Sequence, residues 1–226
     1  MKQYTTLFLD LDGTLLDFDK SERAAVKKAL KMNGLPHDDE TATMYAAINK
    51  SFWERFERGE IPKSAIFEGR FKELFARIGH SCDVTKLSDE YCGCLAEGHD
   101  LTENSIEILT YLKNAGYSLY ATTNGLSTTQ YRRIKDSGLD FFFDGIFVSE
   151  DAGHKKPEKE YFEYVIDHIG EKDRGKMLIV GDSCSSDILG GINAGIDTCW
   201  YNPKGAAGRF VPTYEIKNLL DLMKIL

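Results

Sequence analysis

Four short segments carry side chains that together suit the transfer of a phosphoryl group. Each segment follows an apolar run or begins a helical pattern, and each holds acidic, hydroxyl, amide or amine groups. Phosphoryl transfer needs a nucleophile, positive charge for the phosphoryl oxygens and a proton for the leaving group. Every one of these roles has a candidate here. The candidates are Asp10 and Asp12 in DLDGTL, Thr123 and Asn124 in TTNG, Lys156 in KKP, and Asp182, Ser183 and Asp187 in GDSCSSD.

The carboxylates suggest both a nucleophile and a metal site. Oxygen ligands from Asp10 and Asp182 suit Mg²⁺, which prefers one or two carboxylates together with waters and substrate phosphate oxygens. A metal-bound carboxylate stays deprotonated, so Asp10 remains a competent nucleophile and would form an aspartyl-phosphate. Asp12 stands two residues later and is close enough to protonate the leaving oxygen. We therefore expect Mg²⁺ as the cofactor.

Other polar groups are candidates for holding the phosphoryl oxygens. The Thr123 hydroxyl and the Asn124 amide would bind these oxygens, and Lys156 would supply fixed positive charge to the aspartate and the phosphate. Thr122 competes with Thr123 for this role, but the end of the predicted strand before Asn124 favours Thr123.

Asp187 and Ser183 are candidates for supporting roles. Asp187 lies five residues after Asp182 and would orient either the metal-bound waters or Lys156. Ser183 is as compatible with capping the helix that follows as with a place near the metal.

The elements that must position these residues alternate between strands and helices. Short apolar runs separated by helical patterns predict parallel strands with helices covering both faces of the sheet. Ligands of such sheets collect beyond the carboxyl ends of the strands, where most of the candidate residues fall. The sequence thus predicts an α/β fold with a doubly wound parallel sheet. The expected strands are residues 4–10, 117–123, 146–149, 177–180 and 198–201.

A different pattern fills the stretch between about residues 20 and 98. Apolar residues recur there at intervals of three or four and predict consecutive helices without an intervening strand. We expect an all-α module at residues 18–98, inserted into a core formed by residues 1–17 and 99–226. Arg70 lies among the aromatic residues of this module, and its position fits either a solvated face or a substrate contact.

Composition limits the partners. The chain has 226 residues and a formal net charge of −8. This charge argues against a nucleic acid polymer as partner, because proteins that bind such polymers usually carry a basic face.

The sequence also bears on targeting. The apolar run of residues 7–11 is broken by Asp10 and followed by Asp12, so we expect no secretory signal. No stretch approaches the roughly 20 apolar residues of a membrane helix. Five cysteines without a complete zinc pattern favour reduced thiols in a cytoplasmic protein.

The four segments, in this order, resemble the four signatures of the haloacid dehalogenase superfamily. The resemblance spans the whole predicted core and implies a Rossmann-like domain with a helical cap inserted after the first strand. It also implies that Asp12 binds Mg²⁺ through its backbone carbonyl while its carboxyl transfers the proton. A cap of this kind would close over the site and exclude water.

Within the superfamily, the stretch GDSCSSDILGGINAGIDTCWYNP and the TTNG turn resemble the subgroup that dephosphorylates pyrimidine nucleoside 5′-monophosphates. We therefore expect a small phosphorylated metabolite, and a nucleoside monophosphate in particular, as the substrate. A sugar-phosphate phosphatase or a phosphomutase of the β-phosphoglucose type would share the same core residues. A haloacid dehalogenase would need neither Mg²⁺ nor an acid at Asp12, and a silent binding or regulatory protein would not need every catalytic role filled.

Overall fold

The computed structural model describes residues 3–226, which form two compact units. The chain up to Asp17 and the segment Leu101–Leu226 form the first, here called the core unit. The segment Phe18–Asp100 forms the second, here called the helical unit. The structure therefore divides the chain after Asp100, two residues later than the border expected from the sequence.

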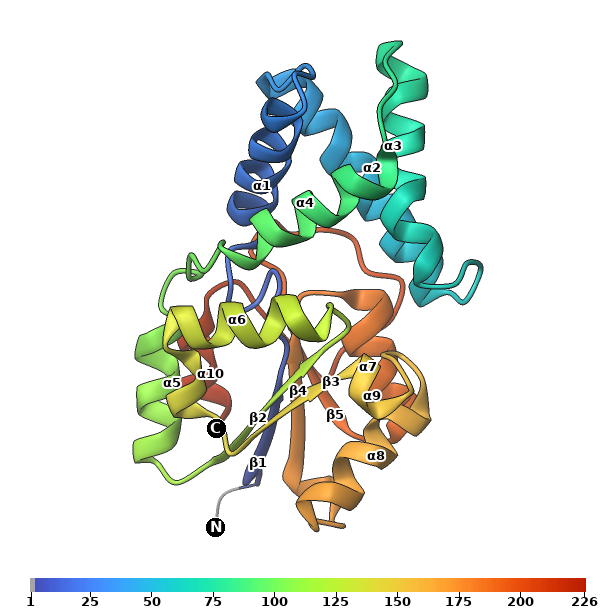
Figure 1. The fold of residues 1–226 in the computed structure, drawn as a ribbon. Coiled ribbons are helices and arrows are strands. Elements are labelled where there is room, and N and C mark those ends of the chain that lie inside the picture. Colours follow the sequence, from blue (N-terminus) through green and yellow to red (C-terminus); the bar gives the residue numbers. More distant parts are fainter. Residues whose placement is uncertain (1–2) are drawn as a thin grey trace. The chain divides into compact units, whose positions relative to one another are not determined.

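A six-stranded sheet in the order β3-β2-β1-β4-β5-β6 forms the centre of the core unit, and its pairings are parallel (Figure 1). Leu9 pairs with Ala121 of β2 and with Val180 of β4, so the residues that follow these three strands emerge at one edge. The predicted α/β class is confirmed. The strands are β1 Thr6–Leu9, β2 Ser118–Thr123, β3 Gly145–Val148, β4 Met177–Gly181, β5 Asp197–Tyr201 and β6 Tyr214–Ile216.

Helices cover both faces of this sheet. Figure 1 shows α5 and α10 on one side and α8 and α9 on the other. The helices are α5 Ser105–Asn114, α6 Ser127–Ser137, α7 Ser149–Ala152, α8 Lys159–Ile169, α9 Leu189–Ala194 and α10 Leu222–Ile225. Single turns of tighter or wider helix occupy Leu139–Phe142, Arg174–Lys176, Cys184–Ile188 and Leu219–Asp221.

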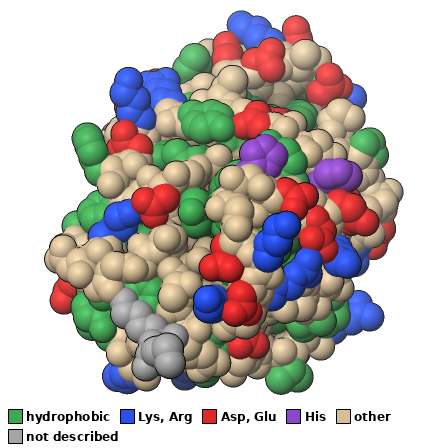
Figure 2. All heavy atoms as spheres, turned by 90° about the horizontal axis from the view of Figure 1, so that it is seen from below, with side chains coloured by type: hydrophobic (Ala, Val, Ile, Leu, Met, Phe, Trp, Pro, Cys, Tyr) green, Lys and Arg blue, Asp and Glu red, His purple; other side chains and the backbone are tan. Residues whose placement is uncertain are grey.

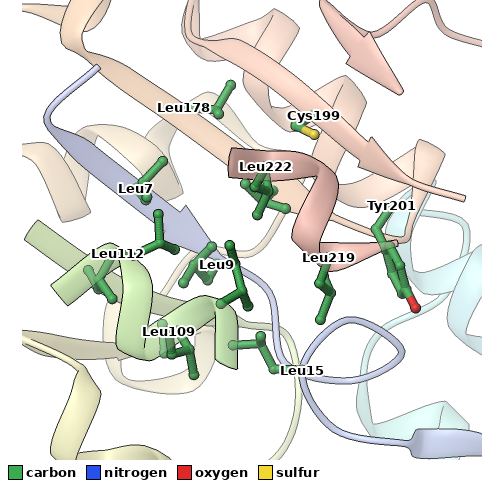
Figure 3. Packing of buried hydrophobic residues seen from close by; sticks show 14 of the residues in the cluster. Leu7, Leu9, Leu15, Leu109, Leu112, Leu178, Cys199, Tyr201, Leu219 and Leu222 are labelled. Carbon is green, nitrogen blue, oxygen red and sulfur yellow. The ribbon is translucent and has the colours of Figure 1, made fainter. Parts of the chain in front are cut away.

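Alternate residues of β1 face the two helical layers. Leu7 and Leu9 are buried among leucines of α5 and the C-terminal segment, as Figure 3 shows for Leu109, Leu112 and Leu222. The intervening Phe8 belongs to a separate cluster on the opposite face, formed with residues of α8, β4 and α9. Because the strand is buried on both faces, it reads as a continuous apolar run rather than as an alternating one. This packing fixes the strand end that carries Asp10.

The helical unit consists of α1 Phe18–Met32, α2 Asp39–Glu57, α3 Ser64–Ile78 and α4 Val84–Ala96. Its interior is aromatic, and the ring of Tyr45 lies 5.1 Å from that of Phe71. Arg70 is only 2 % exposed and donates a hydrogen bond to Asn49 at 3.0 Å. Its guanidinium carbon lies 4.4 Å from the centre of the Tyr91 ring. The possibility of a solvated face for Arg70 is therefore wrong.

The surface drawn in Figure 2 carries Lys and Arg side chains interspersed with Asp and Glu, without a broad basic field on that face. Among the helices of residues 3–226, none is both long and apolar enough to cross a membrane. The five cysteines are free thiols.

Candidate active site

The turn that follows β1 presents Asp10 at the carboxyl edge of the sheet. Asp10 continues the strand's pairing, since its N–H donates to the Val180 carbonyl at 2.9 Å. The chain then turns back on itself, with the N–H groups of Leu15 and Leu16 donating to the Leu11 carbonyl. Gly13 has a φ of 86°, a left-handed conformation that favours glycine. The DLDGTL segment is thus a tight turn that brings both of its acidic residues, Asp10 and Asp12, to the end of the strand.

Lys156 connects three parts of the site through its ammonium group. Nζ donates to Asp10 Oδ1 at 2.7 Å, to Asp187 Oδ1 at 2.7 Å and to the Thr122 carbonyl at 2.8 Å. An ammonium has three donors, so all of them are used. Burial by itself lowers the pKa of Lys156, but the two carboxylates outweigh burial and raise the pKa above its ordinary value. Lys156 is therefore a fixed positive charge within the site.

Asn124 holds the loop that carries this lysine. Its Nδ2 donates to the Lys156 carbonyl at 2.8 Å, and its Oδ1 accepts from the Lys156 N–H at 2.9 Å. Both polar atoms of the amide are therefore engaged with the backbone of Lys156. The structure gives Asn124 a positioning contact, and its expected contact with phosphoryl oxygens stays a prediction.

Three carboxylates gather beside Lys156. One ligand oxygen from each of Asp10, Asp182 and Asp187 lies within 4.8 Å of the others. Burial raises the pKa of Asp10 to about 7 despite the opposing effect of Lys156. Burial and the neighbouring Asp10 raise the pKa of Asp182 well above its usual value. These carboxylates have more negative charge than one lysine balances, and a divalent cation would stabilise their ionised forms.

The backbone leaves room for these carboxylates at two glycines. A Cβ on Gly13 would lie 2.4 Å from Asp182 Oδ2, and a Cβ on Gly181 would lie 2.2 Å from Asp187 Cγ. Contacts this short do not occur for a real Cβ, so a side chain at either position would displace an acidic group. The oxygen donors and the space reserved for them fit a hard cation such as Mg²⁺.

The Asp12 carboxyl lies outside this acidic cluster and contacts α6 instead. Gln130 Nε2 donates to Asp12 Oδ2 at 2.8 Å, and Arg133 Nη1 donates to Asp12 Oδ1. Both α6 residues are buried. Neither residue is among the candidates predicted from the sequence, although their spacing of three places them on one face of the helix that follows β2. A buried arginine on that face needs a charged partner, and Asp12 is that partner.

Ser183 and Asp187 lie in one turn and contact each other, and their supporting roles in the reaction stay predictions. The Ser183 hydroxyl accepts from the Ser186 N–H at 3.2 Å, which is a capping contact. The Ser183 N–H donates to Asp187 Oδ2 at 3.0 Å, so the turn also orients Asp187. A further contact was not anticipated: the Thr14 hydroxyl donates to Asp10 Oδ2 at 3.1 Å. The Asp10 carboxylate is consequently held at both oxygens.

Comparison with known proteins identifies the family. Residues 4–195 match the sequence profile described as haloacid dehalogenase-like hydrolase. The chain belongs to this family. The resemblance to this family drawn from the four segments is therefore confirmed.

Relatives of this haloacid dehalogenase-like hydrolase match over nearly their whole length. The HAD-hydrolase YfnB of Bacillus subtilis (strain 168) is 41 % identical over 100 % of this chain and 97 % of its own. Its crystal structure, bound to magnesium, superposes with a TM-score of 0.94 at 40 % identity, covering 99 % of each chain.

Two further relatives have named activities. The pyrimidine 5′-nucleotidase PynA of Streptococcus pneumoniae is 36 % identical over 99 % of this chain and 95 % of its own. The pyrimidine 5′-nucleotidase YjjG of Escherichia coli is 32 % identical over 97 % of this chain and 96 % of its own. The prediction that the protein is an enzyme of the phosphoric monoester hydrolase class is confirmed by these matches.

Proposed function

We propose that this hydrolase removes the phosphate of pyrimidine nucleoside 5′-monophosphates, with Mg²⁺ as cofactor and Asp10 as the covalent nucleophile. The reaction class rests on one observation, the buried Lys156 ammonium shared by Asp10 and Asp187 beside a third carboxylate. The substrate class rests on the two nucleotidases that match the chain from end to end.

The proposed chemistry has two displacements at phosphorus. An Asp10 carboxylate oxygen attacks the phosphorus, the ester P–O bond breaks, and its electron pair goes to the leaving oxygen, which takes a proton from the Asp12 carboxyl. Water then attacks the aspartyl-phosphate, the Asp12 carboxylate accepts a proton from that water, and the bond from phosphorus to Asp10 breaks. Inorganic phosphate leaves and both aspartates return to their starting forms.

The acidic cluster is the proposed metal site. Asp10 and Asp182 would hold Mg²⁺ with their carboxylates, the Asp12 carbonyl would contribute as the family resemblance implies, and Asp187 would orient the metal's waters or Lys156. When bound, Mg²⁺ would neutralise charge on the phosphoryl oxygens and keep Asp10 ionised. The helical unit is the proposed cap domain.

Replacing Asp182 tests the metal site separately from the nucleophile. Asp182→Asn keeps the size of the side chain but removes the charge of one ligand, so the Mg²⁺ concentration for half-maximal activity should rise at least about tenfold. A Mg²⁺ titration of kcat measures this. Asp136→Asn, which changes an exposed carboxylate on α6, should leave the titration unchanged. An unaltered Mg²⁺ requirement in Asp182→Asn would exclude Asp182 as a ligand.

A substrate panel tests the proposed function as a whole. Phosphate release should be measured from pyrimidine and purine nucleoside monophosphates, sugar phosphates and p-nitrophenyl phosphate, with Mg²⁺ and with a chelator. We expect UMP or dTMP to have the highest kcat/KM and the chelator to abolish turnover. A preference for sugar phosphates would contradict the nucleotide assignment while retaining the chemistry. Interconversion of sugar phosphates without net phosphate release would point to a phosphomutase.

A further inference from the structure

Gln130 on α6 links the two sides of the site through a single amide. Its Nε2 donates to Asp12 Oδ2 at 2.8 Å and to Thr123 Oγ1 at 2.7 Å, while its Oε1 accepts from Arg133 Nη1 at 3.2 Å. The orientation of the amide follows from these partners, because a carboxylate oxygen only accepts and a guanidinium only donates. Every polar atom of Gln130 therefore has an assigned partner, and the residue is 1 % exposed.

The contact with Gln130 also orients the Thr123 hydroxyl. Thr123 Oγ1 accepts from Gln130 Nε2 and from the Gly125 N–H at 3.1 Å. A hydroxyl has two acceptor sites and one donor, so both acceptor sites are used and the proton is left to donate. Thr123 is thereby prepared to donate to an acceptor such as a phosphoryl oxygen.

Arg133 holds the other oxygen of Asp12. Its side chain is fully buried, and Nη1 contacts Asp12 Oδ1 as well as the Gln130 amide oxygen. The Asp12 side chain keeps 25 % of its surface exposed, so the carboxyl is held at both oxygens and still reaches solvent. A group that exchanges protons with a leaving oxygen and with water needs both of these properties.

The backbone reserves space for this arrangement at Gly125. A Cβ there would lie 2.6 Å from Gln130 Cδ and 2.7 Å from Nε2. The glycine of the TTNG segment is therefore required by the position of the glutamine side chain, and its φ is not in the left-handed region. A methyl group at position 125 would push Gln130 away from its partners without altering any polar residue.

We propose that Gln130 and Arg133, here called the α6 clamp, are positioning residues that fix the Asp12 carboxyl relative to the Thr123 hydroxyl. The clamp acts through Asp12 and makes no contact of its own with the reacting atoms. It sets where the proton is delivered with respect to the phosphoryl group. This inference rests on the proposed acid and base role of Asp12.

The test compares two leaving groups by kcat/KM, which reports the steps up to departure of the leaving group. An alkoxide such as a nucleoside needs the proton from Asp12, whereas p-nitrophenolate leaves with little assistance. In Gln130→Met and in Arg133→Met, kcat/KM for the best alkyl phosphate of the panel should fall at least about tenfold more than for p-nitrophenyl phosphate. Gly125→Ala should show the same selectivity. Arg133→Lys, which keeps a donor, should retain part of the lost activity.

Controls separate positioning from general damage. Arg132→Met changes the exposed neighbour of Arg133 on the same helix and should leave kcat/KM for both substrates unchanged. In an Asp12→Asn background, Gln130→Met should cause no further selective loss, because the clamp would have no acid to position. Thermal melts identify variants that fail to fold. If a methionine variant fails, the comparison of kcat/KM for the two substrates is made with Gly125→Ala and Arg133→Lys.

The outcomes distinguish this inference from the proposed function. Suppose that Asp12→Asn lowers kcat/KM more for the alkyl phosphate than for p-nitrophenyl phosphate, while the clamp variants lower both values equally. The positioning role of the clamp is then wrong, and the acid role of Asp12 stands. If Asp12→Asn itself lowers kcat/KM equally for both substrates, the acid role of Asp12 is wrong, and the positioning role of the clamp is wrong with it. Additive selective losses in the double variant would also overturn the clamp.

Discussion

Asp10→Asn should reduce kcat by at least about ten-thousandfold while the protein stays folded. An amide cannot form the acyl phosphate that the proposed first displacement requires. Asparagine keeps an oxygen that can accept from Lys156 or Thr14, and Lys156 retains its bonds to Asp187 and Thr122. Burial already raises the pKa of Asp10, so removing its charge relieves desolvation rather than adding to it. The measurement is phosphate release with Mg²⁺, together with a thermal melt.

The matched control is Asp136→Asn, which makes the same chemical change at an exposed position of α6 and should retain full activity. Appreciable Mg²⁺-dependent hydrolysis by Asp10→Asn, measured above the background of a mock purification, would refute the nucleophile assignment.

Lys156→Met should lower both stability and activity. Methionine is about as long as lysine but leaves three acceptors without the ammonium, namely two carboxylates and the Thr122 carbonyl. Removing one partner of a buried ion pair typically costs about 3–5 kcal/mol, because the remaining charge is left uncompensated. We expect a loss in the free energy of unfolding of that order and a fall in kcat/KM of at least about a hundredfold. Urea denaturation without Mg²⁺ and phosphate release with Mg²⁺ measure the two effects.

The adjacent lysine provides the comparison. Lys155→Met removes a partly exposed charge whose Nζ lies 3.6 Å from Glu158, and such a pair contributes about 0–1 kcal/mol. Near-wild-type stability in Lys156→Met would show that the buried carboxylates do not depend on this ammonium.

The strands could be predicted because the sheet is buried on both faces. A buried parallel strand reads as an apolar run, and the predicted run at residues 177–180 differs from β4 Met177–Gly181 by one residue. β6 Tyr214–Ile216 was missed because it is only three residues long and only Ile216 is fully buried. A strand that short carries no periodic signal. The order of the strands in the sheet could not be predicted, because it depends on which strands pair in the folded protein.

The candidate site could be predicted where chemistry restricts the residue type. Acidic residues and a lysine at strand ends indicate phosphoryl transfer, and the structure brings Asp10, Asp182, Asp187 and Lys156 together. Gln130 was missed because a glutamine inside a helix resembles an ordinary surface residue. Only the tertiary packing of α6 reveals its partners.

Arg70 illustrates a second limit of the sequence. An arginine at helical spacing usually lies on a solvated face, with its charged end in water. Here the aromatic residues of the helical unit surround the guanidinium, and Asn49 accepts from it. The sequence records which residues are aromatic but not that their rings meet around one charged group.

The stereochemical course at phosphorus tests the central claim most directly. A substrate whose phosphoryl group is made chiral with oxygen isotopes should be hydrolysed in the presence of Mg²⁺, and the configuration of the released phosphate determined. Each in-line displacement inverts phosphorus, so two displacements through an Asp10 aspartyl-phosphate predict overall retention. Overall inversion would mean that water attacks the substrate directly, and it would contradict the covalent role of Asp10.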